Sequence, residues 1–212
     1  YIFRFNEPLR PGQKRNLEYS LVIQQQGFKH DKKDTAFVRN GTFLHNNRLA
    51  PYIGFNTEYM IEDKHVRKAY GLPEIAVMPD LDDHSQHHNN ALRQDSDFIQ
   101  FKATVSTSTD QTAIAPGSLV KRWTEDERRY FSYQATAPIH NFYSFLSGRY
   151  EVLKGRWNHV DIDILYHPTH NFNLERMLDS VKDSLSYFSQ AFSPYQYDYL
   201  RIIEFPAYRK MA

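Results

Sequence analysis

The chain of 212 residues is 41% hydrophobic and 15% aromatic, which supplies enough apolar material for a sizeable core and argues against disorder. Its 26 Lys and Arg residues are balanced by 25 Asp and Glu residues, so no net positive field indicates a nucleic-acid partner. The sequence has no cysteine, which excludes disulfides and thiolate chemistry, and no apolar run of the ~20 residues that span a bilayer.

The first fifty residues show the patterns of β-structure. Apolar and polar side chains mostly alternate over 17–23, which predicts a half-buried strand. Farther along, Asn40-Gly41 separates short runs at 35–38 and 42–44, and this dipeptide favours a tight hairpin turn. We therefore expect a strand followed by a hairpin.

From 56 onward the pattern changes, and up to 97 a helix signal and a polar loop replace the alternation typical of strands. Thr57 can cap a helix, and Gly71 with Pro73 can end it, so a short surface helix is predicted between them. A polar, histidine-rich loop follows over 79–90 and contains too little apolar material to be buried.

Two histidines of this loop, His84 and His88, are weak candidates for metal ligands. Their spacing of four residues would let one helix face present both to a cation. The zinc-peptidase motif, however, requires Glu directly after the first histidine, and Ser85 stands at that position. We therefore expect a solvated loop, with metal binding as the minor alternative.

The second half of the chain contains the clearest strand patterns. The predicted strands are 99–105, 130–133, 150–153, 160–166 and 199–203. Pro116-Gly117, between the first two, predicts a turn. His167 and His170 lie on either side of Pro168, and we expect them in a connection between domains rather than at a metal.

After 168 the apolar period changes from two to that of a helix. Asn171 or Asn173 can cap the start of this helix, and Pro194 ends it. Its apolar face consists of Leu174, Leu178, Val181, Leu185, Phe188 and Phe192. We expect these six side chains to pack between domains.

Together, these patterns predict a mainly β fold. It is an antiparallel β-sandwich, followed by a helix and a strand that open a second domain. The predicted domains are 1–168 and 169–212. The sequence has no nucleophile elbow, phosphate-binding loop or dinucleotide fingerprint, so we assign no catalytic residue.

Several segments of the second half also match a known family in their order along the chain. They are FKATVSTS (101–108), APGSL (115–119), RYFSY (129–133), FYSFLSGRY (142–150), ILYHP (164–168), SLSYF (184–188) and LRIIEFP (200–206). In these segments the chain resembles the aminopeptidase N-like zinc metallopeptidases, specifically the bacterial branch fused to the membrane part of an ABC-type permease. The resemblance implies that the segments up to 168 belong to the β-sandwich before the catalytic domain. The span 56–97 departs from a typical sandwich of the family and would be a helix-containing insertion. The last two segments would open the α/β catalytic domain.

The family's catalytic motifs do not occur in this sequence. These motifs are a Gly-x-Met-Glu-Asn loop that binds the substrate amine and a His-Glu-x-x-His helix that, with a later Glu, holds zinc. The resemblance implies that they follow Ala212, so it assigns no catalytic or metal residue here. Zinc would be a cofactor of the parent protein and not of this part.

The resemblance also implies partners and a location. The partners would be the chain's own downstream peptidase domain, a membrane-embedded permease segment and, indirectly, a peptide substrate. The location would be that of a soluble domain of a bacterial inner-membrane protein, on the extracytoplasmic (periplasmic) side.

These expectations lead to three functional hypotheses. In the first, the chain is a non-catalytic N-terminal domain that packs against the catalytic domain and limits peptide access to its cleft. In the alternative, it is an extracytoplasmic module that binds a glycan or a transporter substrate through its aromatic residues and the insertion. In the third, it is a free-standing metalloenzyme built on His84 and His88, which would require zinc binding and hydrolysis by this chain alone.

Overall fold

The computed structural model describes residues 4–24, 36–38, 40–52, 60–75, 80, 82–86 and 97–205. Its contacts divide the chain into two units, Tyr1–His30 and Asp31–Ala212.

The predicted strand over 17–23 is wrong. The described residues of the first unit contain no strand, and Leu17, Tyr19 and Leu21 are all more than half exposed. An alternating sequence forms a stable strand only where neighbouring strands pair with it and bury its apolar side. Among the described residues of this unit, no such partner is present.

The second unit begins with the predicted hairpin, which is confirmed. β1 (Phe37–Val38) and β2 (Gly41–His45) pair antiparallel. β2 also pairs with β9 (Ser144–Gly148), and β9 pairs with β5 (Thr112–Ile114). The result is a four-stranded sheet in the order β1-β2-β9-β5.

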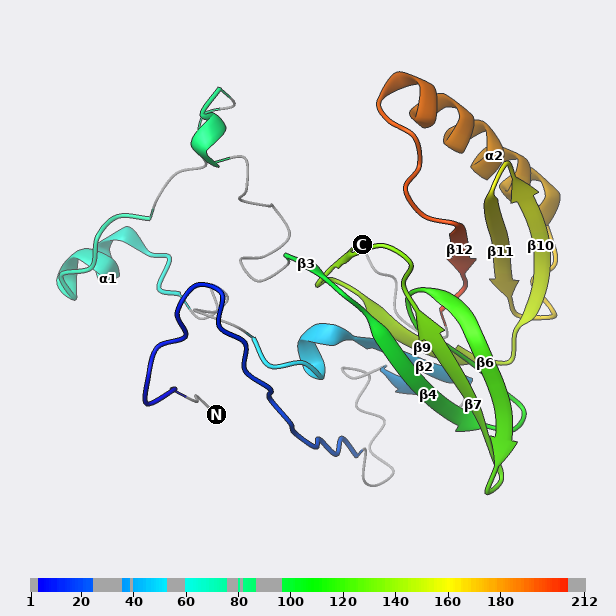
Figure 1. Cartoon of the computed structure of the whole chain (residues 1–212), viewed down its shortest axis with the longest axis horizontal. Coiled ribbons are helices and arrows are strands. Elements are labelled where there is room, and N and C mark those ends of the chain that lie inside the picture. Colours follow the sequence, from blue (N-terminus) through cyan, green and yellow to red (C-terminus); the bar gives the residue numbers. More distant parts are fainter. Residues whose placement is uncertain are drawn as a thin grey trace. The chain divides into compact units, whose positions relative to one another are not determined.

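A second sheet covers this one. It consists of β4 (Lys102–Ser108), β7 (Arg128–Gln134) and β6 (Ser118–Glu125), all antiparallel (Figure 1). The two sheets share a core of buried side chains: Phe101, Ala113, Ala115, Phe131, Tyr133 and Ile139. The described chain is thus mainly β, with antiparallel sheets packed over a common core, which confirms the predicted fold class.

The predicted strand over 99–105 is divided into two strands. β3 (Phe98–Ile99) pairs with β8 (Ile139–His140), whereas β4 pairs with β7. Between β3 and β4, the carbonyl of Phe101 accepts a hydrogen bond from the N–H of Ala135 at 3.1 Å. Because the alternation of side chains continues across the break, the sequence pattern does not reveal it.

The described part of the predicted insertion contains one α-helix, α1 (Lys64–Ala69). The Asp63 carboxylate caps it by accepting from two backbone N–H groups at 2.8 and 2.9 Å. Gly71, with a φ of 65°, ends it, and the N–H of Leu72 bonds back to the helix at 2.9 Å. The predicted end is therefore confirmed, and the predicted cap at Thr57 lies outside the described residues.

The last four elements form a separate layer. β10 (Glu151–Trp157) and β11 (Val160–Tyr166) pair antiparallel, and β12 (Tyr199–Ile203) pairs parallel with β11. α2 (Leu174–Ala191) is the crossover that a parallel connection requires. The predicted helix and the strands over 160–166 and 199–203 are confirmed. The strand predicted over 150–153 continues to Trp157.

The start of α2 differs from its prediction in one detail. Asn173 occupies the cap position, but its φ is 61° and its side chain makes no capping hydrogen bond. The predicted boundary after 168 falls between β11 and β12, which pair with each other. The division into 1–168 and 169–212 therefore stays a prediction.

Candidate docking surface

The six predicted packing residues of α2 separate into two groups. Leu178 and Leu185 are buried against Val160, Ile162 and Ile164 of β11. Leu174 and Val181 are partly buried against the same cluster. In contrast, Phe188 and Phe192 are 55% and 78% exposed. Most of the apolar face therefore packs on the chain's own sheet, and only its C-terminal end presents rings to solvent.

A glycine determines how closely α2 approaches the sheet. A Cβ atom added to Gly155 of β10 would collide with the side chain of Leu178. Gly155 therefore provides the space that Leu178 fills, because protein cores are close-packed. Sequence reasoning missed this residue, although an isolated glycine inside a strand pattern is a known signal of close approach.

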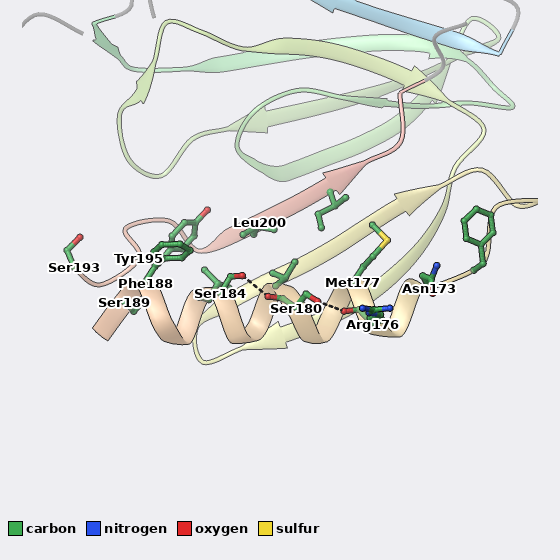
Figure 2. A pocket seen from close by; sticks show the side chains of 14 residues that line it. Asn173, Arg176, Met177, Ser180, Ser184, Phe188, Ser189, Ser193, Tyr195 and Leu200 are labelled. Atoms are coloured by element: carbon green, nitrogen blue, oxygen red, sulfur yellow. Dashed lines mark hydrogen bonds between the residues drawn. The ribbon is translucent and has the colours of Figure 1, made fainter. Parts of the chain in front are cut away.

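An open groove of about 790 Å³ lies between α2 and β12 (Figure 2). Apolar side chains, including Met177, Val181, Leu185, Leu200 and Ile202, line much of it. Figure 2 shows Asn173 at one end of the groove, and Phe188 and Tyr195 toward the other. Arg176 is the one charged residue among those that line it. The groove is thus a largely apolar surface.

Two serines of the groove do not offer free donors. Ser180 Oγ donates to the Arg176 carbonyl, and Ser184 Oγ donates to the Ser180 carbonyl, both at 2.8 Å (Figure 2). Hydroxyls that bond to the preceding helical turn are turned away from a ligand. The groove is therefore better suited to apolar side chains than to a polar substrate.

One edge of β12 has no partner strand among the described residues. The Asp161 N–H donates to the Asp198 carbonyl, and the Glu204 N–H donates to the Leu165 carbonyl, both at 2.9 Å. In a parallel ladder these two bonds direct the backbone groups of the even-numbered β12 residues toward β11. The backbone groups of Tyr199, Arg201 and Ile203 therefore point to the open edge. Of these groups, the Tyr199 carbonyl accepts from the Tyr195 hydroxyl at 3.3 Å.

Side chains at the start of β12 attach this strand to the sandwich. The Asp198 carboxylate accepts from Ser118 Oγ at 3.3 Å and from Thr136 Oγ1 at 3.1 Å. The backbone N–H of Gly117 donates to the Tyr199 hydroxyl at 2.9 Å. These contacts hold β12, and with it one wall of the groove, against the turn predicted at Pro116-Gly117.

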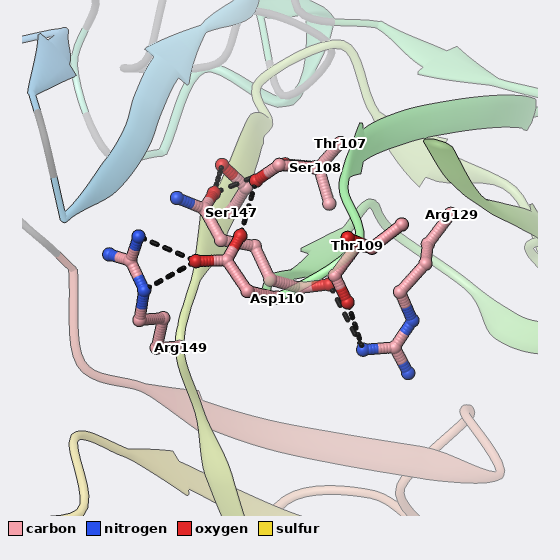
Figure 3. A network of polar contacts seen from close by, with 8 residues as sticks. Thr107, Ser108, Thr109, Asp110, Arg129, Ser147 and Arg149 are labelled. Atoms are coloured by element: carbon pink, nitrogen blue, oxygen red, sulfur yellow. Dashed lines mark hydrogen bonds and ion pairs between the residues drawn. The ribbon is translucent and has the colours of Figure 1, made fainter. Parts of the chain in front are cut away.

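A separate polar network lies at the turn between β4 and β5 (Figure 3). Asp110 accepts from Ser108 Oγ at 2.7 Å and from Arg149 Nε and Nη2 at 2.7 and 2.6 Å. These hydrogen bonds, first that of Ser108 and then that of Arg149, hold the pKa of Asp110 below its usual value. Arg129 donates to the carbonyls of Thr109 and Gln111, both at 3.3 Å. Because the carboxylate is paired, we interpret the network as structural.

Only one of the two histidines predicted as weak metal candidates lies among the described residues, so their role stays a prediction. His84 begins a short 3-10 helix, His84–Gln86, and His88 lies outside the described residues. Across the described ranges, no group of three or more His, Asp or Glu side chains could hold a metal ion. The donor set that zinc needs is therefore not present in this part of the chain.

His167 and His170, which flank Pro168, lie in the connection after β11. The backbone N–H of His167 donates to Glu204 Oε2 at 2.8 Å, and His170 Nδ1 lies 2.6 Å from Glu204 Oε1. Glu204 directly follows β12, so its carboxylate ties the beginning of the α2 crossover to the end of the returning strand.

None of the described helices is long and apolar enough to cross a membrane.

Comparison with known proteins gives a partial likeness. No protein-family model and no curated protein matches the chain. Among solved structures, the M1 zinc metallopeptidase from Deinococcus radiodurans is similar over 54% of this chain, with a TM-score of 0.47 and 16% identity. A mutant of that enzyme with a bound Tyr-Ser-Ala substrate gives the same values. A two-domain M1 zinc metallopeptidase mutant bound to L-tryptophan has 15% identity at the same TM-score. The match spans 28% of each of those chains.

Proposed function

We propose that the chain is the non-catalytic N-terminal part of a zinc aminopeptidase-like protein and packs against the catalytic domain of that protein. The observation that carries the proposal is the open apolar groove over β12. Soluble domains rarely leave contiguous apolar surface exposed unless another surface covers it. Five of the fourteen residues that line the groove belong to the segments SLSYF and LRIIEFP of the family resemblance: Ser184, Leu185, Phe188, Leu200 and Ile202.

In this proposal the sandwich forms one wall of the catalytic cleft and restricts entry to short or unfolded peptide ends. Hydrolysis at a zinc ion benefits from a shaped cavity that limits the access of water. The motifs of the following domain would hold the zinc. We further propose, from the resemblance alone, that the parent protein carries a permease segment in the membrane and that this domain lies on the extracytoplasmic side.

The docking role can be tested by comparing this chain with a form extended through the proposed catalytic domain. We expect the shorter chain to bind an apolar fluorescent dye and to self-associate in light scattering, because its groove is open. In the extended form both signals should fall, because the catalytic domain covers the groove. Equal dye binding by two equally monomeric forms would contradict the proposal.

A matched pair of variants tests whether the dye binds in the groove. Phe188→Ser removes a groove ring that is 55% exposed and should lower dye binding by the shorter chain. Tyr70→Ser removes a ring that is 73% exposed beside α1 and should leave dye binding unchanged. Saturable binding of a sugar or peptide by this chain alone would instead favour the hypothesis of a binding module. Zinc-dependent hydrolysis by this chain alone would favour the hypothesis of a free-standing enzyme.

A further inference from the structure

The first unit carries a concentration of positive charge that the chain as a whole does not have. Residues 4–15, which we refer to as the basic turn, contain four cations and a single carboxylate, Glu7. The four cations are all exposed: Arg4, Arg10, Lys14 and Arg15. Because the full chain has a net charge of only +1, the residues outside the basic turn are net negative. Such a charge asymmetry within one chain is a signal of an anionic partner.

The chain reverses its direction within the basic turn. Gly12 has a φ of 80°, the left-handed conformation that a glycine adopts in such turns. The N–H of Gln13 donates to the Arg10 carbonyl at 3.0 Å, and the N–H of Arg10 donates to Gln13 Oε1 at 2.9 Å. The guanidinium of Arg15 lies over the Phe5 ring, 5.0 Å from its centroid. The reversal therefore brings the two arms of the basic turn, and the cations on them, together.

Neighbouring side chains do not neutralise these charges. None of the four cations of the basic turn forms an ion pair with another described residue. Two apolar side chains of the same stretch are also exposed, Phe5 at 57% and Leu9 at 46%. Unpaired cations beside exposed apolar groups complement a membrane surface, whose headgroups supply negative charge and whose interface accommodates apolar side chains.

We propose that the basic turn binds the surface of a membrane that contains anionic lipids. The inference does not rest on the proposed function, because none of these residues lines the groove. Clusters of about four to eight Lys and Arg residues recognise anionic headgroups, and the basic turn has four. A nucleic acid fits less well, because the basic turn could neutralise only a few phosphates and Leu9 would gain nothing from them.

Co-sedimentation of the full chain with lipid vesicles tests the proposal. Vesicles of phosphatidylglycerol and phosphatidylcholine in equal parts present anionic headgroups, and vesicles of phosphatidylcholine alone are the neutral reference. We expect saturable binding to the anionic vesicles that weakens as sodium chloride is added, because salt screens the charges. Binding to the neutral vesicles should be weak. Equal binding to both kinds of vesicle, or none to either, would overturn the proposal.

Removing charge from the basic turn should weaken the binding. Each cation near an anionic surface contributes about a fivefold factor, so Arg10→Gln, Lys14→Gln and Arg15→Gln together should weaken binding on the order of a hundredfold. The matched control makes the same change in net charge at exposed lysines of the second unit: Lys64→Gln, Lys68→Gln and Lys154→Gln. The control should keep most of the binding. Equal losses in the two triple variants would show that only net charge matters and that the basic turn is not the site.

The apolar side chains distinguish a membrane from another polyanion. Phe5→Ser combined with Leu9→Ser keeps every charge and should weaken binding to the anionic vesicles by on the order of tenfold, because less apolar surface enters the interface. Unchanged binding by this variant would indicate a site for polyanions in general and would overturn the assignment to a membrane. Tighter binding of the unchanged chain to single-stranded RNA than to the anionic vesicles would identify a nucleic acid as the partner and overturn it as well.

Discussion

Arg201 of β12 binds the backbone of Gly117, in the turn before β6. Its Nη1 donates to the Gly117 carbonyl at 2.6 Å, and its guanidinium lies over the rings of Tyr133 and Tyr199, at 5.5 and 5.0 Å from their centroids. The carboxylate of Asp163 lies 3.6 Å from Nε. Because the N–H of Gly117 donates to Tyr199, two β12 side chains bind both backbone groups of one residue. This contact attaches the α2 layer to the sandwich.

Arg201→Met should destabilise the chain by about 1.5–3 kcal/mol, because it removes a charge-assisted hydrogen bond and leaves a carbonyl without its donor. Arg156→Met is the matched control, since Arg156 also pairs with an Asp of β11, Asp161, at 3.5 Å. These two side chains are 66% and 69% exposed, so the control should cost less than about 1 kcal/mol. The urea midpoint, at an unchanged m-value, measures both. Equal losses would show that Arg201 is not the attachment point.

Gly117 itself should not tolerate a side chain. Its φ is 98°, and an added Cβ would collide with the backbone of Gln134. Gly117→Ala should therefore cost at least about 3 kcal/mol, from backbone strain and the collision together. Gly71→Ala is the control, because Gly71 also has a positive φ, 65°, but open space around it, and it should cost about 1–2 kcal/mol. Similar unfolding free energies for the two variants would contradict this account.

Elements with a complete local pattern could be predicted from the sequence. The hairpin around Asn40-Gly41, the strand over 160–166 and the helix from Leu174 each carry their own periodicity and turn residues. The apolar face of α2 was predicted from the sequence, and its packing between domains stays a prediction. Phe188 and Phe192 are exposed, whereas Leu178 and Leu185 are buried in the chain's own core. A helical period identifies an apolar face but not the surface that covers it.

Contacts between distant residues could not be predicted. Arg201 and Gly117 are separated by 84 positions, and no local pattern links a charged residue in a strand to a distant turn. The parallel pairing of β11 with β12 likewise depends on the crossover through α2 and not on either strand alone. The residues over 17–23 show the converse, because their alternation lacks a partner strand among the described residues of the first unit.

The contact between β10 and α2 can be measured by a double-mutant cycle. Gly155→Ala should cost about 1–3 kcal/mol, because the new methyl group overlaps the Leu178 side chain. Leu178→Ala should cost about 2–5 kcal/mol but leaves space for that methyl group. The double variant should therefore lose less than the sum of the two, by about 1 kcal/mol or more. Gly155→Ala combined with Leu185→Ala should be nearly additive, and additivity in both pairs would contradict direct contact.

Two tyrosines whose hydroxyls are buried should respond oppositely to removal of that hydroxyl. Tyr133 Oη donates to the Ala113 carbonyl at 2.9 Å, whereas Tyr150 Oη is buried and has no partner among the described residues. Tyr133→Phe should cost about 1–3 kcal/mol, because it leaves a buried carbonyl unpaired. Tyr150→Phe should be neutral or stabilising, because it removes an unpaired buried hydroxyl. Urea unfolding at neutral pH compares them, and equal losses would show that Tyr150 has an acceptor.

The raised pKa of Tyr133 should make the free energy of unfolding fall as the pH rises above 10. Burial raises the pKa of its hydroxyl from 10.0 to about 12 in the folded state. Since the unfolded chain then releases this proton first, the stabilisation is fully present below pH 10 and is lost as the pH rises to 12. Free energies of unfolding at pH 8, 10 and 11 should therefore fall less steeply in Tyr133→Phe than in the unchanged chain. Burial also raises the pKa of Tyr150, so a variant that lacks both hydroxyls should have the flattest curve. A Tyr133→Phe curve parallel to that of the unchanged chain would show that Tyr133 titrates alike in the folded and unfolded states.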